Sequence, residues 1–271
     1  MLPRKNSRMI DYHIHTARCG HADGDMVDYI KRGRDRSLLE IGFADHLPLL
    51  TREDPTLAMP LGELAGYIEA VELLKKDFPD IAIKTGIEAD YFPGMEADTR
   101  RLLEQYKFDY VIGSIHFIDG WGFDDSRYIE GYEGRDIYEL YEGYFELVVR
   151  AASSGLFDIV GHLDLIKKYN FRPKRDITSL VEEVILAIKD TGVCVEINTA
   201  GLRKPAAEMY PSDWILELCA RAGIPVTLGS DAHSPGQVGM DFDLALASAR
   251  RAGYDRIAVF ERRERGFIAL R

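Results

Sequence analysis

Cysteine is scarce in this sequence, and its three cysteines lie far apart. Cys19, Cys194 and Cys219 are too few and too scattered to form a disulfide framework, and this pattern is typical of proteins from a reducing compartment. Long apolar runs are also lacking, because no stretch approaches the roughly 20 residues needed to cross a bilayer. The first ten residues, MLPRKNSRMI, lack the apolar core of a signal peptide. We therefore expect a cytoplasmic protein with no membrane partner.

Basic residues are outnumbered by acidic ones. The chain has 34 Lys and Arg against 45 Asp and Glu, which gives a formal net charge of −11. This balance argues against a broad nucleic-acid partner surface and against binding to an anionic membrane. It does not exclude a small phosphorylated substrate, because a local cluster of cations and metal ions could hold one.

Linkers, internal repeats and low-complexity tracts are absent as well, so we expect a single domain over residues 1–271. Short apolar runs alternate with longer amphipathic segments. The predicted strands are 9–13, 40–44, 81–89, 110–114, 159–162, 193–198, 225–229 and 256–260, and the predicted helices include 61–77, 137–154, 179–191, 212–222 and 242–252. This alternation is typical of an α/β fold with parallel strands, and seven or eight such units fit a (β/α) barrel better than an open sheet. Residues 120–134 lack a pattern and are predicted to form a structureless loop over the site.

The placement of the histidines is the strongest functional signal. Each of the seven ends an apolar, strand-like run or lies within a few residues of one, beside Gly or Asp: His13, His15, His21, His46, His116, His162 and His233. Taken singly, most would be buried, hydrogen-bonded histidines. Together they indicate a polynuclear metal site, because neutral imidazole is a common metal ligand and barrel enzymes place their chemistry at the carboxyl ends of strands.

Three local patterns support a metal site. His13 and His15 are two residues apart on a strand, so both imidazoles can face one ion, although they could also be two satisfied polar residues. Glu88 ends the apolar run IKTGIEA, where a carboxylate could bridge two ions or form an ordinary salt bridge. Asp231 and His233 in GSDAHS repeat the alternating spacing, although Asp231 could equally cap a helix.

Six segments together carry a specific resemblance. DYHIHT, ADHLP, GIEADYFPG, GSIHF, GHLDL and GSDAH occur in this order, and with them the chain resembles the PHP (polymerase and histidinol phosphatase) superfamily over essentially its whole length. Within that superfamily it looks most like the monofunctional histidinol-phosphate phosphatases of histidine biosynthesis. The further shared segments are FDYVIGSIHF, GHLDLIKKY, EINTAGLRKP and YPSDWILELC.

The resemblance implies a distorted (β/α)7 TIM-like barrel, the PHP fold, that carries three divalent ions. By motif, the first ion would be held by His13, His15, Glu88 and Asp231, the second by Glu88, His116 and His162, and the third by His21, His46 and His233. All nine positions carry the expected residue type. The ligand set does not choose among Zn, Fe and Mn.

The resemblance also suggests how L-histidinol phosphate would be hydrolysed. A hydroxide between the first two ions would attack the phosphoryl group, and the third ion would bind its oxygens. Arg203 and Lys168 match positions where the family places phosphate-binding cations, although either could be an ordinary surface cation. Asp231 or Asp45 could handle the proton, and Asp45 could instead orient His46 or His15. These expectations make Asp231, Glu88 and Asp45 the candidate catalytic residues.

Other readings of the sequence stay open. A PHP phosphoesterase could act on another small phosphate ester, a nucleotide or a DNA end, and a metal-binding regulator without catalysis would be expected to lack ligands. Tyr91, Phe117 and Trp121 could form an apolar wall against a substrate ring, or they could be plain core. The cysteines are expected to be small core residues, with Cys19 near the metals but not required by the ligand set.

Overall fold

Seven parallel strands form the centre of the fold. The computed structural model describes residues 9–270. Its main sheet has the order β1 (Ile10–Ile14), β2 (Glu40–Phe43), β3 (Ala82–Asp90), β4 (Tyr110–Ser114), β7 (Ile159–Val160), β8 (Cys194–Asn198) and β9 (Val226–Gly229). Beyond the end of β9, the Ala232 nitrogen donates to the His13 carbonyl at 3.1 Å, and the His15 nitrogen donates to the Ala232 carbonyl at 3.0 Å. These bonds bring the two edges of the sheet together, so the predicted distorted (β/α)7 barrel is confirmed.

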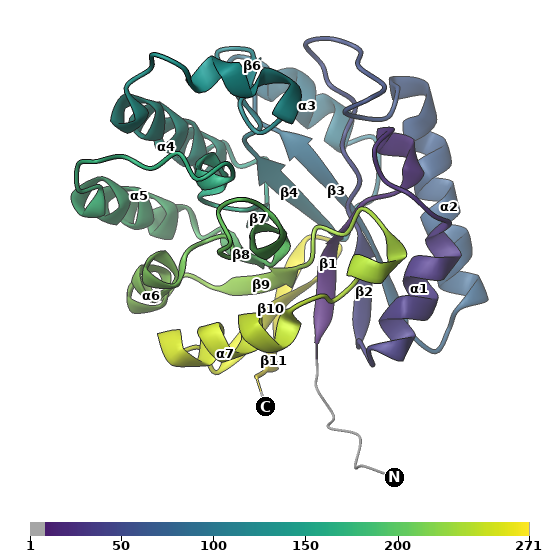
Figure 1. Cartoon of the computed structure of the whole chain (residues 1–271). Helices are drawn as coiled ribbons and strands as arrows, with labels where there is room; N and C mark the ends of the chain where they lie inside the picture. The colour runs from purple at the N-terminus through teal and green to yellow at the C-terminus, as the bar shows by residue number, and fades with distance from the viewer. Residues whose placement is uncertain (1–8, 271) are drawn as a thin grey trace.

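Helices cover the outside of this barrel (Figure 1), and they are α1 (Met26–Asp35), α2 (Leu64–Asp77), α3 (Glu96–Leu103), α4 (Ile137–Ser153), α5 (Thr178–Thr191), α6 (Asp213–Ala222) and α7 (Phe242–Ala252). In α4, apolar side chains at helical spacing are buried against the strands, including Tyr141, Phe145 and Val148. The Asp136 carboxylate caps this helix by accepting the Tyr138 N–H at 2.8 Å. None of the helices between residues 9 and 270 is long and apolar enough to cross a membrane.

A shift in strand register shapes the barrel interior. The pairing of β1 with β2 is irregular between Asp11 and Ile14. As a result Tyr12 and His13 both contact interior groups: the Tyr12 ring stacks on Tyr110 with centroids 4.7 Å apart, and His13 Nε2 lies 3.3 Å from Glu88 Oε2. A glycine is needed at position 86, because a Cβ there would overlap the Tyr110 ring. The interior near the amino-terminal ends of the strands is therefore filled by aromatic rings. The interior near their carboxyl ends is filled by imidazoles and carboxylates.

The eighth predicted strand does not enter the barrel. Residues 256–260 lie in β10 (Arg256–Glu261), but β10 pairs antiparallel with β11 (Glu264–Ala269) as a hairpin. The expectation of a possible eighth barrel unit is therefore wrong, because the tight turn at residues 262–263 gives β10 a partner next to it in sequence. Phe260 of β10 packs beside Tyr12 and Tyr110, so the hairpin covers the amino-terminal end of the barrel.

The segment 120–134 is more ordered than predicted. It contains β6 (Trp121–Gly122), which pairs with β5 (Phe117–Ile118), and a 3-10 helix over Ser126–Tyr132. The expectation of a structureless loop is wrong because Asp125 caps the helix by accepting the Arg127 N–H at 2.9 Å. The segment does border the cavity described below. The first eight residues, whose sequence lacks a signal-peptide core, lie outside the described part of the chain.

Candidate metal centre

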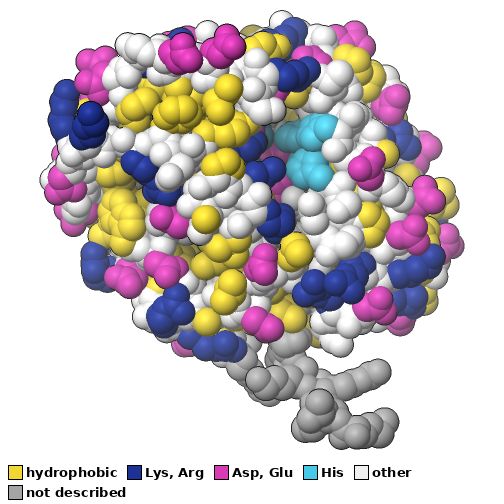
Figure 2. Space-filling view, viewed as in Figure 1, with side chains coloured by type: hydrophobic (Ala, Val, Ile, Leu, Met, Phe, Trp, Pro, Cys, Tyr) yellow, Lys and Arg dark blue, Asp and Glu magenta, His cyan; other side chains and the backbone are white. Residues whose placement is uncertain are grey.

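A cavity of about 720 Å³ opens at the carboxyl ends of the barrel strands. Figure 2 shows histidine side chains at this hollow, with basic side chains beside them. The lining includes the predicted ligands Glu88 and Asp231 and five of the predicted ligand histidines: His21, His46, His116, His162 and His233. His13 and His15 lie beneath it and are almost fully buried. The cavity therefore lies where a barrel enzyme places its reacting groups.

Glu88 lies at the centre of the histidines. One of its oxygens, Oε2, is 3.0 Å from His46 Nδ1, and the other, Oε1, is 3.0 Å from His162 Nε2. In all, five imidazoles approach the carboxylate within 4 Å: His13, His15, His46, His116 and His162. Because β3 carries Glu88 inward between β2 and β4, a single carboxylate reaches both sides of the site.

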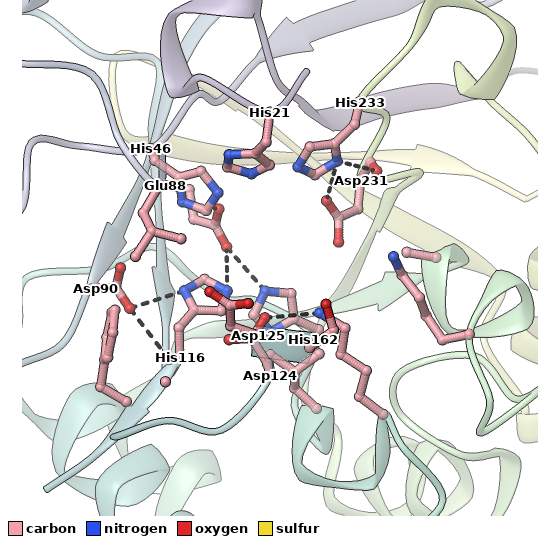
Figure 3. Close-up of a pocket in the computed structure, with 18 of the residues that line it drawn as sticks. His21, His46, Glu88, Asp90, His116, Asp124, Asp125, His162, Asp231 and His233 are labelled. Atoms are coloured by element: carbon pink, nitrogen blue, oxygen red, sulfur yellow. Dashed lines mark hydrogen bonds and ion pairs between the residues drawn. The ribbon is translucent and has the colours of Figure 1, made fainter. Parts of the chain in front are cut away.

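The other predicted ligands lie around the same cavity (Figure 3). Asp231 Oδ1 is 3.3 Å from His15 Nε2. The His233 ring lies 4.1 Å from the His15 ring and 4.9 Å from the His21 ring, measured between centroids. All nine predicted ligands are thus brought together from seven separate segments of the sequence.

The donor atoms form compact groups that could each hold one ion. Atoms within 4.8 Å of one another occur in the sets His13, His15 and Asp231; His13, Glu88 and His162; and His21, His46 and His233. These sets overlap strongly with the three sets implied by the resemblance. A further set joins His15 and His233 with Cys19, whose buried thiol also donates to the Thr16 carbonyl at 3.2 Å.

Two buried atoms in this cluster show that a cation fits it. His13 Nε2 and Glu88 Oε2 face each other at 3.3 Å, and neither has a hydrogen-bond partner among the described residues. A buried carboxylate oxygen without a hydrogen bond is costly unless a cation neutralises it. Imidazole and carboxylate donors together are typical of Zn, Mn or Fe sites.

The electrostatics keep Glu88 and His233 in forms that can bind metal. Burial alone would raise the pKa of Glu88, but His13, His46 and His116 outweigh it and hold the pKa well below its ordinary value. Burial and the charge of His15 lower the pKa of His233 to about 3, so its imidazole is neutral. Conversely, burial alone would lower the pKa of His13, but Glu196 and Glu88 raise it well above its ordinary value. The acidic surroundings of His13 therefore favour a bound cation. When metal is absent, that cation is the proton on the His13 ring.

The backbone is strained at two of the predicted ligands. His162 has a φ of 21° and Asp231 a φ of 52°, in a region that residues other than glycine rarely adopt. The His162 N–H is held by Glu196 Oε2 at 2.9 Å. Such strain is often found at functional sites, where the surrounding structure enforces it.

Glu196 supports the site but was not predicted from the sequence. Its Oε1 lies 2.7 Å from His13 Nδ1, which turns the other ring nitrogen of His13 toward Glu88. The carboxylate also accepts from Asn198 Nδ2 at 3.0 Å. Gly229 leaves room for it, since a Cβ there would overlap Glu196 Oε1. The signal was available, because a carboxylate inside the apolar run CVEIN is as unusual as Glu88 in its own run.

Asp90 and Asp45 hold other imidazoles. Asp90 Oδ1 lies 2.9 Å from His116 Nδ1, and Asp90 follows Glu88 by two positions on β3, so the strand alternation could have indicated it. Asp45 is fully buried, 3.4 Å from His15 Nδ1, and accepts the N–H groups of Thr16 and His46. These contacts favour the alternative in which Asp45 orients a ligand over the one in which it transfers a proton.

Cations line the side of the cavity formed after β7 and β8. Lys168 donates to Asp124 Oδ2 at 3.0 Å, and Arg203 donates to the Ser230 carbonyl at 2.6 Å. Lys204, which was not predicted from the sequence, lines the same cavity, and its ammonium group has no hydrogen bond or ion pair within residues 9–270. This wall could hold a phosphate group opposite the imidazoles.

Of the three aromatic residues considered for a substrate wall, one lies at the cavity. Phe117 is among the lining residues. Tyr91 instead donates to Glu96 at 2.6 Å, and the Trp121 ring packs against Tyr132 with centroids 4.8 Å apart.

A family model and two individual relatives match most of this chain. The family model described as "PHP domain" matches residues 11–200. A Deinococcus radiodurans protein named "Probable histidinol-phosphatase" is 39% identical, over 90% of this chain and 94% of the relative. The "Histidinol-phosphatase" of Bacillus subtilis is 32% identical, over 87% of this chain and 97% of the relative.

A solved structure has the same fold. It is the histidinol phosphate phosphatase of Lactococcus lactis subsp. lactis, in complex with Zn, L-histidinol and phosphate. It superimposes with a TM-score of 0.83 at 22% identity, and the match covers 96% of this chain and 99% of the other.

Proposed function

This chain belongs to the PHP domain family, and we propose on that basis that it is a metal-dependent phosphomonoesterase that hydrolyses L-histidinol phosphate to L-histidinol and phosphate. The observation that carries the proposal is the buried Glu88 carboxylate inside a ring of imidazoles, with one atom each of Glu88 and His13 that has no hydrogen bond among the described residues. The relatives that match nearly the whole chain are named for this activity.

Three divalent ions, of Zn, Fe or Mn, fit the donor groups. In this proposal His13, His15, Glu88 and Asp231 hold the first ion, Glu88 with His116 and His162 the second, and His21, His46 and His233 the third. The support is the proximity of the donor atoms in three compact sets. Bound divalent ions would lower the pKa of a water molecule toward 7 and neutralise phosphoryl charge.

The protein's own side chains position the substrate and the attacking water. Arg203 and Lys168 bind the phosphoryl oxygens from the wall opposite the imidazoles, where both line the cavity. The pKa of Asp231 is lowered well below its ordinary value because His13 and His15 outweigh the effect of burial. Asp231 is therefore ionised and can accept a hydrogen bond from the attacking water, which orients that water toward the phosphoryl group. Asp45 and Glu196 keep His15 and His13 oriented from behind.

A steady-state assay against a panel of phosphate esters tests this function. The panel contains L-histidinol phosphate, 3′-phosphoadenosine 5′-phosphate, a sugar phosphate and short single-stranded DNA. We expect the highest kcat/KM for L-histidinol phosphate, loss of activity after chelation, and recovery with Zn, Mn or Fe. Preference for a nucleotide or for DNA would replace this function with the alternative PHP phosphoesterase, and activity that survives metal removal would contradict the metal requirement.

A further inference from the structure

One carboxylate in the cavity has no role in the proposed function. The acidic residues that line the cavity are Glu88, Asp90, Asp124, Asp125 and Asp231. Glu88 and Asp231 belong to the metal ligands, and Asp90 holds His116. Arg127 donates to both oxygens of Asp125, at 3.1 and 2.8 Å from its Nε. Asp124 remains.

Asp124 presents a free oxygen to the cavity. Its Oδ2 accepts from Lys168 Nζ at 3.0 Å, whereas its Oδ1 has no hydrogen-bond donor among residues 9–270. The backbone at Asp124 is fixed, because its carbonyl accepts the Tyr169 hydroxyl at 2.7 Å. Burial alone would raise the pKa of Asp124, but the Lys168 ammonium and His116 together outweigh it and lower the pKa, so the group is ionised. A negative charge beside a phosphate site is unfavourable unless the substrate itself brings a cation to it.

We propose that Asp124 binds the ammonium group of an amino-alcohol phosphate and thereby selects such substrates over plain alkyl phosphates. This inference rests on the proposed function, in which Lys168 holds the phosphoryl group. In a 2-amino alcohol phosphate, only one oxygen and two carbons separate the phosphorus from the nitrogen. A phosphate on Lys168 therefore brings the ammonium within reach of the carboxylate that Lys168 already contacts.

Two matched substrates test this assignment. The first is L-histidinol phosphate and the second is 3-(imidazol-4-yl)propyl phosphate, which lacks only the amine. We expect the wild-type protein to prefer the amine-bearing ester by about 100-fold or more in kcat/KM, because a site built around a polar group rejects the analogue that leaves it unpaired. Asp124→Asn should reduce this preference to a few-fold, mainly by slowing the amine-bearing ester.

Two further variants distinguish loss of amine recognition from a general loss of activity. Asp125→Asn removes a carboxylate from the adjacent position of the same cavity, one already paired with Arg127, and should keep the preference. Lys168→Met should slow both esters by a similar factor and also keep the preference. Bound metal, measured by elemental analysis, should be the same in Asp124→Asn and wild type.

The outcomes are distinguishable. If Asp124→Asn slows both esters equally, Asp124 serves only to hold Lys168 and the inference is overturned. Loss of bound metal in Asp124→Asn would make it a metal ligand, which also overturns the inference. If the wild-type protein hydrolyses both esters equally well, the phosphatase function stands and amine recognition fails. If it hydrolyses neither, the proposed function itself fails.

Discussion

At the residue scale, the site depends most on Glu88. Five imidazoles of predicted ligands lie within 4 Å of its carboxylate. Its two oxygens face different histidines, Oε2 toward His46 and Oε1 toward His162. A carboxylate in this position can bridge two ions, which is the role the family resemblance gives it.

Replacing Glu88 by Ala should remove most of the activity and part of the metal. We expect kcat to fall by at least about 1,000-fold, since two of the three ions share this ligand. Metal content after dialysis, measured by elemental analysis, should fall by about two ions per chain. The exposed Glu183 on α5 is a matched control, and Glu183→Ala should keep both values. A Glu88→Ala protein with normal metal content and rate would show that the bridging assignment is wrong.

The variant Glu196→Gln tests a residue that would affect metal binding only through His13. The variant keeps the shape of the side chain but removes the charge that holds His13 Nδ1 at 2.7 Å. Loss of such a supporting partner typically costs 10- to 100-fold in metal affinity. Competition with a coloured chelator measures this affinity directly. Equal metal affinity in the variant and the wild type would show that Glu196 contributes to packing only.

Cys219 provides a test of pH dependence away from the site. Burial raises its pKa from 9.0 to about 12. Above pH 9 the thiol therefore ionises in the unfolded chain but not in the folded one, so the unfolded state binds fewer protons and the free energy of unfolding falls as pH rises. Each pH unit in this window costs about 1.4 kcal/mol.

The comparison that isolates this effect is between wild type and Cys219→Ala. Chemical denaturation at pH 10 and pH 11 should show a smaller loss of stability in the variant, by about 1.4 kcal/mol. An equal loss of stability between pH 10 and pH 11 in the two proteins would mean that the thiol ionises equally in the folded and unfolded states.

The sequence was sufficient to find functional residues that interrupt or end an apolar run. It was insufficient to find residues whose role depends on partners far away in the sequence. His13, His15 and Glu88 could be selected because each ends an apolar run. Asp124 and Lys204 could not, since their importance comes from facing a cavity built by other segments. The nine predicted ligands all lie around one cavity, and their binding of metal stays a prediction.

At the element scale, the strands that build the site were predicted within one or two residues, because buried parallel strands form short apolar runs. The hairpin of β10 and β11 was only half predicted. The residues of β11 are mostly exposed, and its sequence ERGFIA lacks the alternation of apolar and polar residues that indicates a strand. The 3-10 helix at Ser126–Tyr132 was missed for a similar reason, since it depends on a single Asp cap.

The hairpin should stabilise the barrel without affecting its chemistry. Phe260 is buried against Tyr12 and Tyr110 at the end of the barrel away from the metal centre. Phe260→Ala should lower the free energy of unfolding by about 3 kcal/mol or more because it leaves a cavity. Phe267 on the same hairpin is 43% exposed, and Phe267→Ala should cost much less.

The readouts for this pair are denaturant unfolding and the kcat of the folded protein at low temperature. We expect unchanged kcat and metal content in both variants. A Phe260→Ala protein that is as stable as Phe267→Ala would contradict the packing role of the hairpin.

At the scale of the whole molecule, the barrel explains why segments so far apart in sequence can form one site. Parallel strands all end at the same rim, so each strand can contribute a ligand there. The sequence alone could indicate this architecture through alternation, but only the closure between β1 and Ala232 brings His15 next to Asp231. A single domain over residues 1–271, a cytoplasmic location and the absence of nucleic-acid partners stay predictions.

The most direct test of the central claim is an anomalous diffraction map of the metal-loaded protein, recorded at the absorption edge of the metal supplied. We expect three peaks within the ring of histidines, one beside each of the three donor sets, with the peaks near Glu88 on both sides of its carboxylate. A map without peaks between these side chains, recorded on protein that hydrolyses L-histidinol phosphate, would contradict this expectation.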